Sequence, residues 1–158
     1  MRLVLWCFVL LLVPRLSLVA QREPRSGASA FTIEALGGTA GSALGVGAGL
    51  LVSHAAGECE SEEDLECDLR QAATTGLVSV VGATAGTYLV GRAANTESSF
   101  AGSLLGALAG AAAGVGVIHL LTNEANLSSN NTTLVVAYSV TQGIVAALGS
   151  RIVAAVRR

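Results

Sequence analysis

The chain has 158 residues, enough for a single domain; 52% are hydrophobic and only 13% are charged. In soluble domains about a quarter of the residues are charged. With only 4% aromatic residues, a soluble core of this chain would bury little apolar area, so the composition suits lipid better than water. The chain has no lysine and a net charge of −2, which excludes sites that need a phosphate-binding or Schiff-base lysine and the basic surface that nucleic acid requires.

The first 20 residues are typical of a signal peptide. Arg2 precedes an apolar run from Leu3 to Val13, Pro14 ends that run, and Ala20 supplies a small residue for cleavage. The run is too short to cross a bilayer. We therefore predict an exported protein with a signal peptide over residues 1–20, followed by a flexible tail over residues 21–34.

Two cysteines flank an acidic stretch, CESEEDLEC, which belongs to a predicted loop over residues 54–71. Cys59 and Cys67 form an even pair in a chain expected to be exported, so a disulfide between them is the main expectation, with two free thiols as the alternative.

Four windows contain no Arg, Asp or Glu, and each is long enough to cross a membrane as a helix of about 20 residues. They are Ala35–Gly57, Gln71–Gly91, Ser98–Asn123 and Ala125–Ser150. The sequence therefore predicts an all-α, four-span membrane domain over residues 35–156, arranged as two Gly/Ala-rich helical hairpins. The stretch TTLVVAYSVTQGIV is rich in β-branched residues and partly alternates, so a small transmembrane β-barrel is the alternative.

Glycine recurs at every fourth position within these windows. Residues four apart lie on one helix face, and glycine there leaves a groove in which a second helix can approach to backbone contact. In lipid, this close packing replaces the hydrophobic drive that associates helices in water. The predicted helix-packing residues are Gly37, Gly41, Gly45, Gly49, Gly82, Gly86, Gly102, Gly106, Gly110, Gly114 and Gly143.

Charge divides between the two sides of the predicted four-span domain. The terminal side holds six arginines, whereas the acidic loop holds most of the carboxylates. The positive-inside rule then places the termini in the cytoplasm, whereas a cleaved signal peptide places the new N-terminus outside it. A bacterial outer-membrane location, or the absence of a true signal, would each remove this conflict, so the choice between inner and outer membrane stays open.

The sequence contains no recognisable catalytic or nucleotide-binding motif. No ionisable residue lies deep in any window, which argues against an ion-coupled transporter. We expect Glu34 to begin the first window and to favour a helix N-terminus through the dipole. These observations predict a protein that is not an enzyme, with no cofactor, no metal and no identifiable small-molecule substrate.

The stretches GGTAGSALGVGAG and AGSLLGALAGAAAG resemble those of glycine-zipper proteins, small membrane proteins of the bacterial cell envelope. The resemblance covers residues 35 to 150 and implies envelope association, but it transfers no catalytic residue. We therefore expect an exported integral membrane protein with a structural or interaction role, with the lipid bilayer and a homo-oligomer as its partners. The alternative function is an oligomeric pore or channel.

Overall fold

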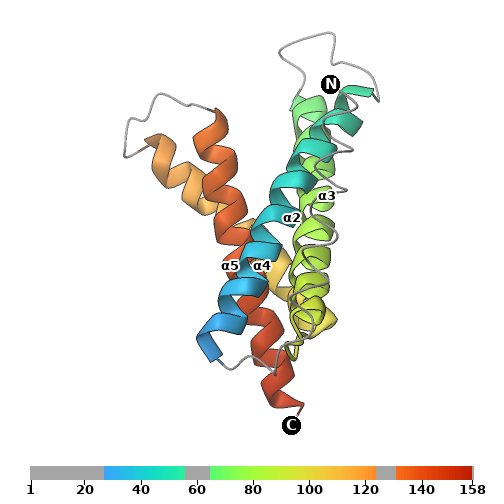
Figure 1. Ribbon diagram of the computed structural model, residues 1–158. Helices are drawn as coiled ribbons and strands as arrows, with labels where there is room; N and C mark the ends of the chain where they lie inside the picture. The colour runs from blue at the N-terminus through green and yellow to red at the C-terminus, as the bar shows by residue number, and fades with distance from the viewer. Residues whose placement is uncertain (1–26, 56–64, 124–130, 158) are drawn as a thin grey trace.

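The computed structural model describes residues 27–55, 65–123 and 131–157. The predicted signal peptide and Cys59 lie outside these residues. The described chain forms four helices, α2 (Gly27–Ala55), α3 (Leu65–Ala93), α4 (Phe100–Asn123) and α5 (Asn131–Val156) (Figure 1). The all-α prediction is therefore confirmed. The β-barrel alternative is wrong, because no strand occurs in the described ranges and TTLVVAYSVTQGIV lies entirely within α5.

All four helices are long and apolar enough to cross a membrane. The candidate spans are Gly27–Ala55, Leu69–Ala93, Phe100–Thr122 and Thr132–Val156. Several boundaries differ from the sequence prediction; α5, for example, begins and ends six residues later than the predicted window Ala125–Ser150. Helix α2 begins at Gly27, so the second half of the predicted flexible tail is helical, and α3 begins at Leu65, inside the predicted acidic loop.

The helices form two antiparallel hairpins, α2 with α3 and α4 with α5, that cross each other (Figure 1). Helix α2 also packs on α5, and α3 contacts both α4 and α5, whereas no Cα atom of α2 lies within 8 Å of one of α4 along their described lengths. The hairpins lie close together at the end that carries Gly27, Asn95 and Val156, which we call the terminal end. They diverge toward the opposite end, near Ala55 and Asn123, which we call the loop end (Figure 1).

A tight turn joins the hairpins at the terminal end. Asn95 adopts a left-handed conformation with φ of 56°, and the next amide, of Thr96, donates a hydrogen bond of 2.9 Å to the Gly91 carbonyl. This is a Schellman ending of α3, in which the left-handed residue reverses the chain and satisfies the last carbonyls. Ser99 then caps α4, because its hydroxyl accepts a hydrogen bond from the Gly102 amide.

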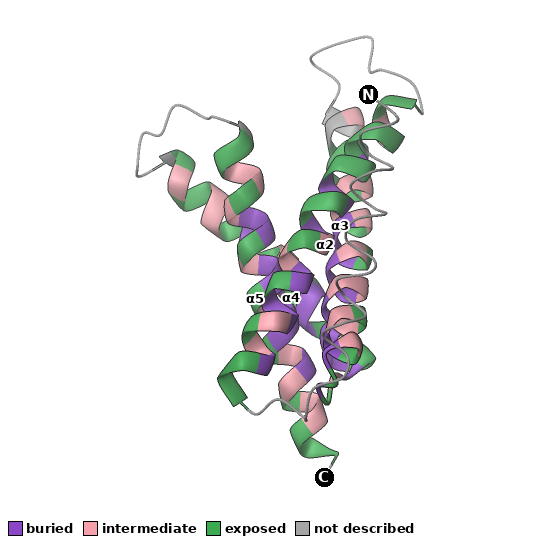
Figure 2. Cartoon of the chain, in the orientation of Figure 1, coloured by how far each residue is buried: buried purple, intermediate pink, exposed green. Residues whose placement is uncertain are grey.

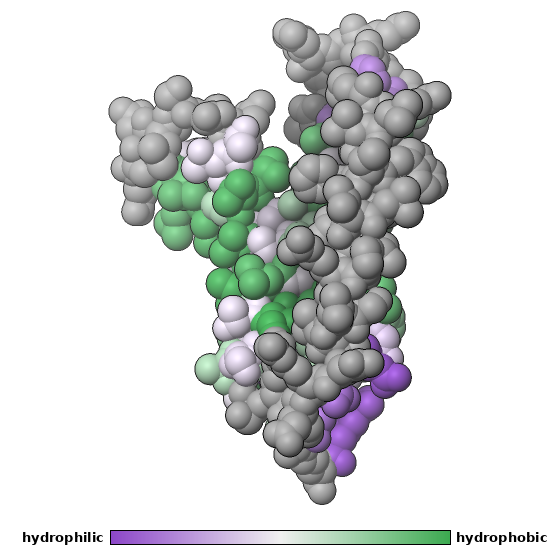
Figure 3. Space-filling view, viewed as in Figure 1, coloured by the Kyte–Doolittle hydropathy of each residue, from purple (hydrophilic) through white to green (hydrophobic). Residues whose placement is uncertain are grey.

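The burial pattern is the reverse of that in a soluble protein. The buried centre lies where the two hairpins cross (Figure 2), and all of the largest fully buried side chains are polar. Large apolar side chains instead cover the outside; Leu44 is 76% exposed and Leu51 is 73% exposed. On the face shown in Figure 3, apolar atoms cover the middle of the molecule and hydrophilic atoms gather toward its ends. An apolar exterior around a small, polar interior suits a bundle surrounded by lipid.

Candidate functional site

Glycine faces glycine between α2 and α3. A Cβ added to Gly41 would overlap the Gly82 carbonyl oxygen, and one added to Gly82 would overlap the Gly41 carbonyl oxygen. Gly37 and Gly86 stand in the same reciprocal relation, and an added Cβ at Gly37 would lie 2.6 Å from the Gly86 oxygen. Each Cα–H therefore points at the partner backbone, the geometry of a Cα–H···O contact. Farther along, Gly45 lies against Ser79 and Gly49 against Thr75.

Helices α4 and α5 approach each other in the same way. Gly102 lies against Gly149 reciprocally, and a Cβ added to Gly106 would lie 2.8 Å from the Ala146 Cα. Gly110 lies against Gln142, and Gly114 against the Tyr138 ring. All four glycines of the row on α4 thus face α5.

Gly143 joins the two hairpins. An added Cβ there would lie 2.8 Å from the Ala35 carbonyl oxygen of α2, and Gly38 of α2 lies against the Gly143 Cα. The structure therefore places every glycine that the sequence singled out against another helix. Gly38 and Gly149 also lie against another helix, although neither belongs to the four-residue pattern that predicts the other contact glycines.

Glu34 is fully buried, seven residues inside α2 rather than at its N-terminus. The sequence interpretation of Glu34 as the start of the span is therefore wrong. Its Oε2 lies 3.2 Å from Arg151 Nε of α5, and its Oε1 accepts a hydrogen bond of 2.5 Å from Thr96 Oγ1. We call these three residues the Glu34 cluster; it links α2, the turn after α3, and α5 at the terminal end. Pairing with Arg151 and Thr96 compensates the loss of water around the carboxylate.

A buried amide connects three helices at mid-bundle. Ser42 Oγ of α2 donates to Gln142 Oε1 of α5, and Gln142 Nε2 donates to the Ala107 carbonyl of α4 at 3.2 Å. Gln142 and Ser42 are both fully buried. Gln142 is the single amide side chain in the span Thr132–Val156, so the need of a buried amide for partners is the signal that could have identified it from the sequence. Its partner Ser42, one hundred residues away, carries no such signal.

Hydroxyl groups continue this polar interior toward the loop end. Ser79 Oγ lies 3.1 Å from Tyr138 Oη and donates to the Gly76 carbonyl at 2.8 Å. Buried hydroxyls of Thr75, Thr87 and Ser139 have no hydrogen-bond partner within the part of the chain that the structure describes. Because an unpaired buried hydroxyl is unfavourable, these three oxygens are sites where a water or ligand oxygen would be stabilised.

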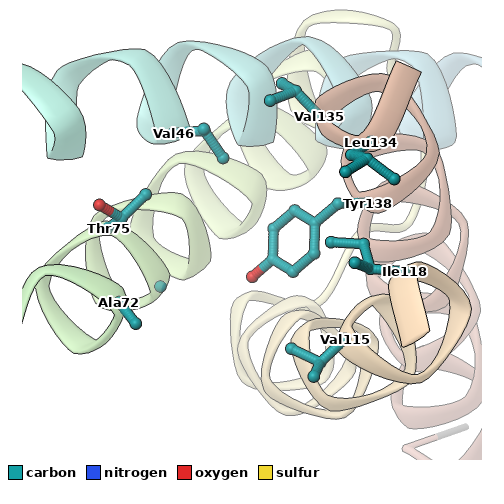
Figure 4. Close-up of a pocket in the computed structure, with 9 residues that line it drawn as sticks. Val46, Ala72, Thr75, Val115, Ile118, Leu134, Val135 and Tyr138 are labelled. Carbon is teal, nitrogen blue, oxygen red and sulfur yellow. The ribbon is translucent and has the colours of Figure 1, made fainter. Parts of the chain in front are cut away.

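A cavity of about 240 Å³ opens where the hairpins diverge. All four described helices contribute to its wall, with Val46, Thr75, Ile118, Val135 and Tyr138 among the lining side chains (Figure 4). The wall is almost wholly apolar and has no charged residue. Among the described residues, no group of three or more His, Cys, Asp or Glu side chains could hold a metal ion.

The predicted disulfide stays a prediction. Cys67 lies in the first turn of α3, and Cys59 lies outside the described residues.

No family model, curated protein or solved structure matches this chain. Its class therefore rests on the fold, a bundle of four described helices with the length and composition of membrane spans.

Proposed function

We propose that the chain is an integral membrane protein of the cell envelope whose four helices all span the bilayer and whose role is structural or interactive. The observation that carries the proposal is the reversed burial pattern. Fully buried Glu34 and Gln142 contrast with Leu44, Leu51 and Val156, which are 73–82% exposed. Water would penalise this arrangement, whereas lipid tails solvate the outer side chains and favour hydrogen bonds inside.

The terminal end has features of a membrane interface. Tyr88 and Phe100 pack edge to face with ring centroids 5.6 Å apart, and the Arg92 guanidinium lies 5.9 Å from the centre of the Tyr88 ring. Aromatic belts and arginines at one end of a bundle are typical of the boundary between lipid and water. These contacts support a terminal end that lies at one membrane surface, with the acidic loop at the opposite surface.

The glycine contacts support a packing role within one chain. In lipid, helix association depends on close backbone approach, and the rows on α2 and α4 provide it against α3 and α5. An oligomer would therefore have to use the apolar outer surface rather than these rows. For the same reason, the alternative of an oligomeric pore built from the glycine faces is less well supported. Leakage of an entrapped dye from liposomes, absent in liposomes without the protein, would favour the pore.

Membrane fractionation tests the proposal. Membranes from expressing cells are washed with alkaline carbonate, which releases peripheral proteins, and then treated with a mild detergent. We expect the protein to stay in the carbonate pellet and to enter solution only with detergent. Release by carbonate, or recovery in the soluble fraction without detergent, would contradict membrane integration.

Thiol labelling tests the orientation. After reduction, Cys59 and Cys67 are exposed to a maleimide that cannot cross membranes, on intact cells and on lysed cells. Labelling of intact cells would place the acidic loop outside, as proposed for an exported envelope protein. Labelling only after lysis would place that loop in the cytoplasm, with the termini on the other side of the membrane, and would contradict a bacterial outer-membrane location.

A further inference from the structure

We propose that the interior of the bundle is a path for protons across the membrane, running from the cavity at the loop end to Glu34 at the terminal end. The inference rests on the proposed membrane integration. It goes beyond a structural role, because it assigns a transport function to buried polar groups that packing alone does not require.

One face of α2 sets the direction of the path. Glu34, Gly38, Ser42 and Val46 follow one another at intervals of four residues, so each step rises about 6 Å along one side of the helix. Val46 lines the cavity and Glu34 carries the buried carboxylate. These two residues are therefore separated by about 18 Å along the axis, and the cavity continues from Val46 toward the loop end.

A polar group lies at each level of this face. Beside Glu34 is Thr96, and over Gly38 is Thr87 Oγ1, which a Cβ on Gly38 would overlap. Ser42 donates to Gln142, and Ser79 and Tyr138 form a hydrogen-bonded pair next to the cavity. Proton relays in membrane proteins are built on buried ionisable side chains, here Glu34, and the hydroxyl groups at the other levels would extend such a relay through water.

The unpaired hydroxyls indicate where water completes the chain. Thr87 is fully buried and Ser139 is 1% exposed, yet neither hydroxyl oxygen has a partner among the described residues. Apart from Thr75, other buried hydroxyls of the described helices do have one; Thr84, for example, donates to the Val80 carbonyl at 2.7 Å. No water-sized space adjoins Thr87 or Ser139 in this closed packing of the described helices, so the path requires a small separation of the helices that admits single water molecules. Such water would satisfy both hydroxyls and bridge the polar groups on either side of them.

Protons can move along this chain without any net chemical change. Each water or hydroxyl oxygen binds an incoming proton at a lone pair and releases its own proton to the next oxygen, so one O–H bond forms as another breaks. At the end of the path the Glu34 carboxylate receives the proton and passes it to water near Arg151, whose side chain is 26% exposed. Ser42, Ser79, Thr87 and Gln142 are 0% exposed, so the interior is too closely packed for hydrated ions or dyes.

Proteoliposomes test the path. The purified full-length protein is reconstituted with an internal pH-sensitive dye, and a potassium gradient with valinomycin drives proton entry. We expect faster acidification than in protein-free vesicles, while entrapped carboxyfluorescein is retained. Thr87→Val keeps the shape of the side chain but removes the hydroxyl. It should lower the proton flux by about tenfold or more, since loss of a positioned proton-transfer group commonly has at least that effect.

Thr84→Val is the matched control, because it makes the same change at a buried threonine of α3 whose hydroxyl is already satisfied. Its flux should equal that of the wild type. Ser139→Ala provides a second test if Thr87→Val does not insert, with Ser103→Ala as its control, since Ser103 donates to the Ser99 carbonyl.

Three results would overturn the path: inserted protein without proton flux, equal flux in the wild type and the path variants, or leakage of carboxyfluorescein. Flotation with the vesicles separates the two proposals. Protein that does not float contradicts membrane integration and the path with it, whereas floating protein without flux contradicts the path alone.

Discussion

Replacing Gly106 by isoleucine should force α4 and α5 apart. The new Cβ would lie 2.8 Å from the Ala146 Cα, and it would overlap the Val145 carbonyl oxygen. Both obstacles are backbone atoms, which cannot rotate away as a side chain can. Restoring an ordinary carbon–carbon separation of about 3.6 Å therefore requires a shift of about 0.8 Å between the helices.

The cost follows from the contacts that this shift weakens. A gap of 0.5–1 Å forfeits a quarter to a half of the dispersion energy of each atom pair, which is itself about 0.15 kcal/mol. If about 40 atom pairs along the interface lose a third of that energy, the loss is about 2 kcal/mol. Overpacking of protein cores costs a similar amount, about 1–3 kcal/mol.

The assay is unfolding in a mild detergent, followed by circular dichroism, for Gly106→Ile and for Gly116→Ile. Gly116 lies on the same helix, and an added Cβ there meets no atom within 4 Å. Both variants gain the same helix propensity, about 0.5 kcal/mol, so their difference isolates packing. Ala107 would be a poor control despite its different helix face, because it is fully buried against Val80, Ala83 and Ala146.

We expect Gly106→Ile to unfold more easily than the wild type and Gly116→Ile to match or exceed it. Equal stability of the two variants would refute the reasoning. The close approach of α4 and α5 at Gly106 would then contribute no more to the free energy of unfolding than the open position Gly116 does.

Three further substitutions test contacts elsewhere in the bundle. Asn95→Ala should lower the free energy of unfolding by about 1 kcal/mol, because alanine lacks the tolerance of asparagine for the left-handed conformation, whereas Asn95→Gly should not; chemical denaturation of both variants checks this. Arg151→Met leaves the buried Glu34 carboxylate without its cation and should cost about 3 kcal/mol, and adding Glu34→Gln should recover part of that loss in thermal unfolding. Gln142→Leu should cost about 1–3 kcal/mol by leaving the Ser42 hydroxyl unpaired, and a Ser42→Ala, Gln142→Leu double variant that is no more stable than Gln142→Leu would contradict the hydrogen bond.

The four spans could be predicted from the sequence because lipid tolerates few charges, so uncharged windows correspond closely to helices. The first boundary was wrong for the same reason. Glu34 ended the window as a charged residue, but in the fold Arg151 and Thr96 compensate its charge, and the helix continues back to Gly27. A scan for charged residues considers each residue alone, so it cannot show that Glu34 has a partner 117 residues away in the sequence.

The glycine spacing indicated which residues lie on a contact face, since helical periodicity is a local property. It could not assign partners. Gly41 meets Gly82, whereas Gly45, one turn farther along the same face, meets Ser79. Such pairings depend on how the two helices cross, which the spacing within either helix does not specify. Most of the polar interior was missed because serine and threonine are common in membrane helices and have no local sign of burial, whereas Gln142 had such a sign as a lone amide in an apolar span.

The reciprocal glycine pairs of α2 and α3 also restrict how this chain can change by mutation. When a larger residue replaces one partner of an ordinary contact, a smaller residue on the other side can restore the fit. Gly37 faces Gly86 and Gly41 faces Gly82, and no amino acid is smaller than glycine. A bulky substitution at Gly41, Gly82 or Gly86 therefore has no compensating substitution at the position it faces, so suppressor mutations would have to arise elsewhere in the bundle. At Gly37 the added Cβ would also meet the Val90 side chain, where a smaller residue could relieve part of the overlap. Where Gly106 faces Ala146, by contrast, Ala146→Gly remains open as a direct suppressor.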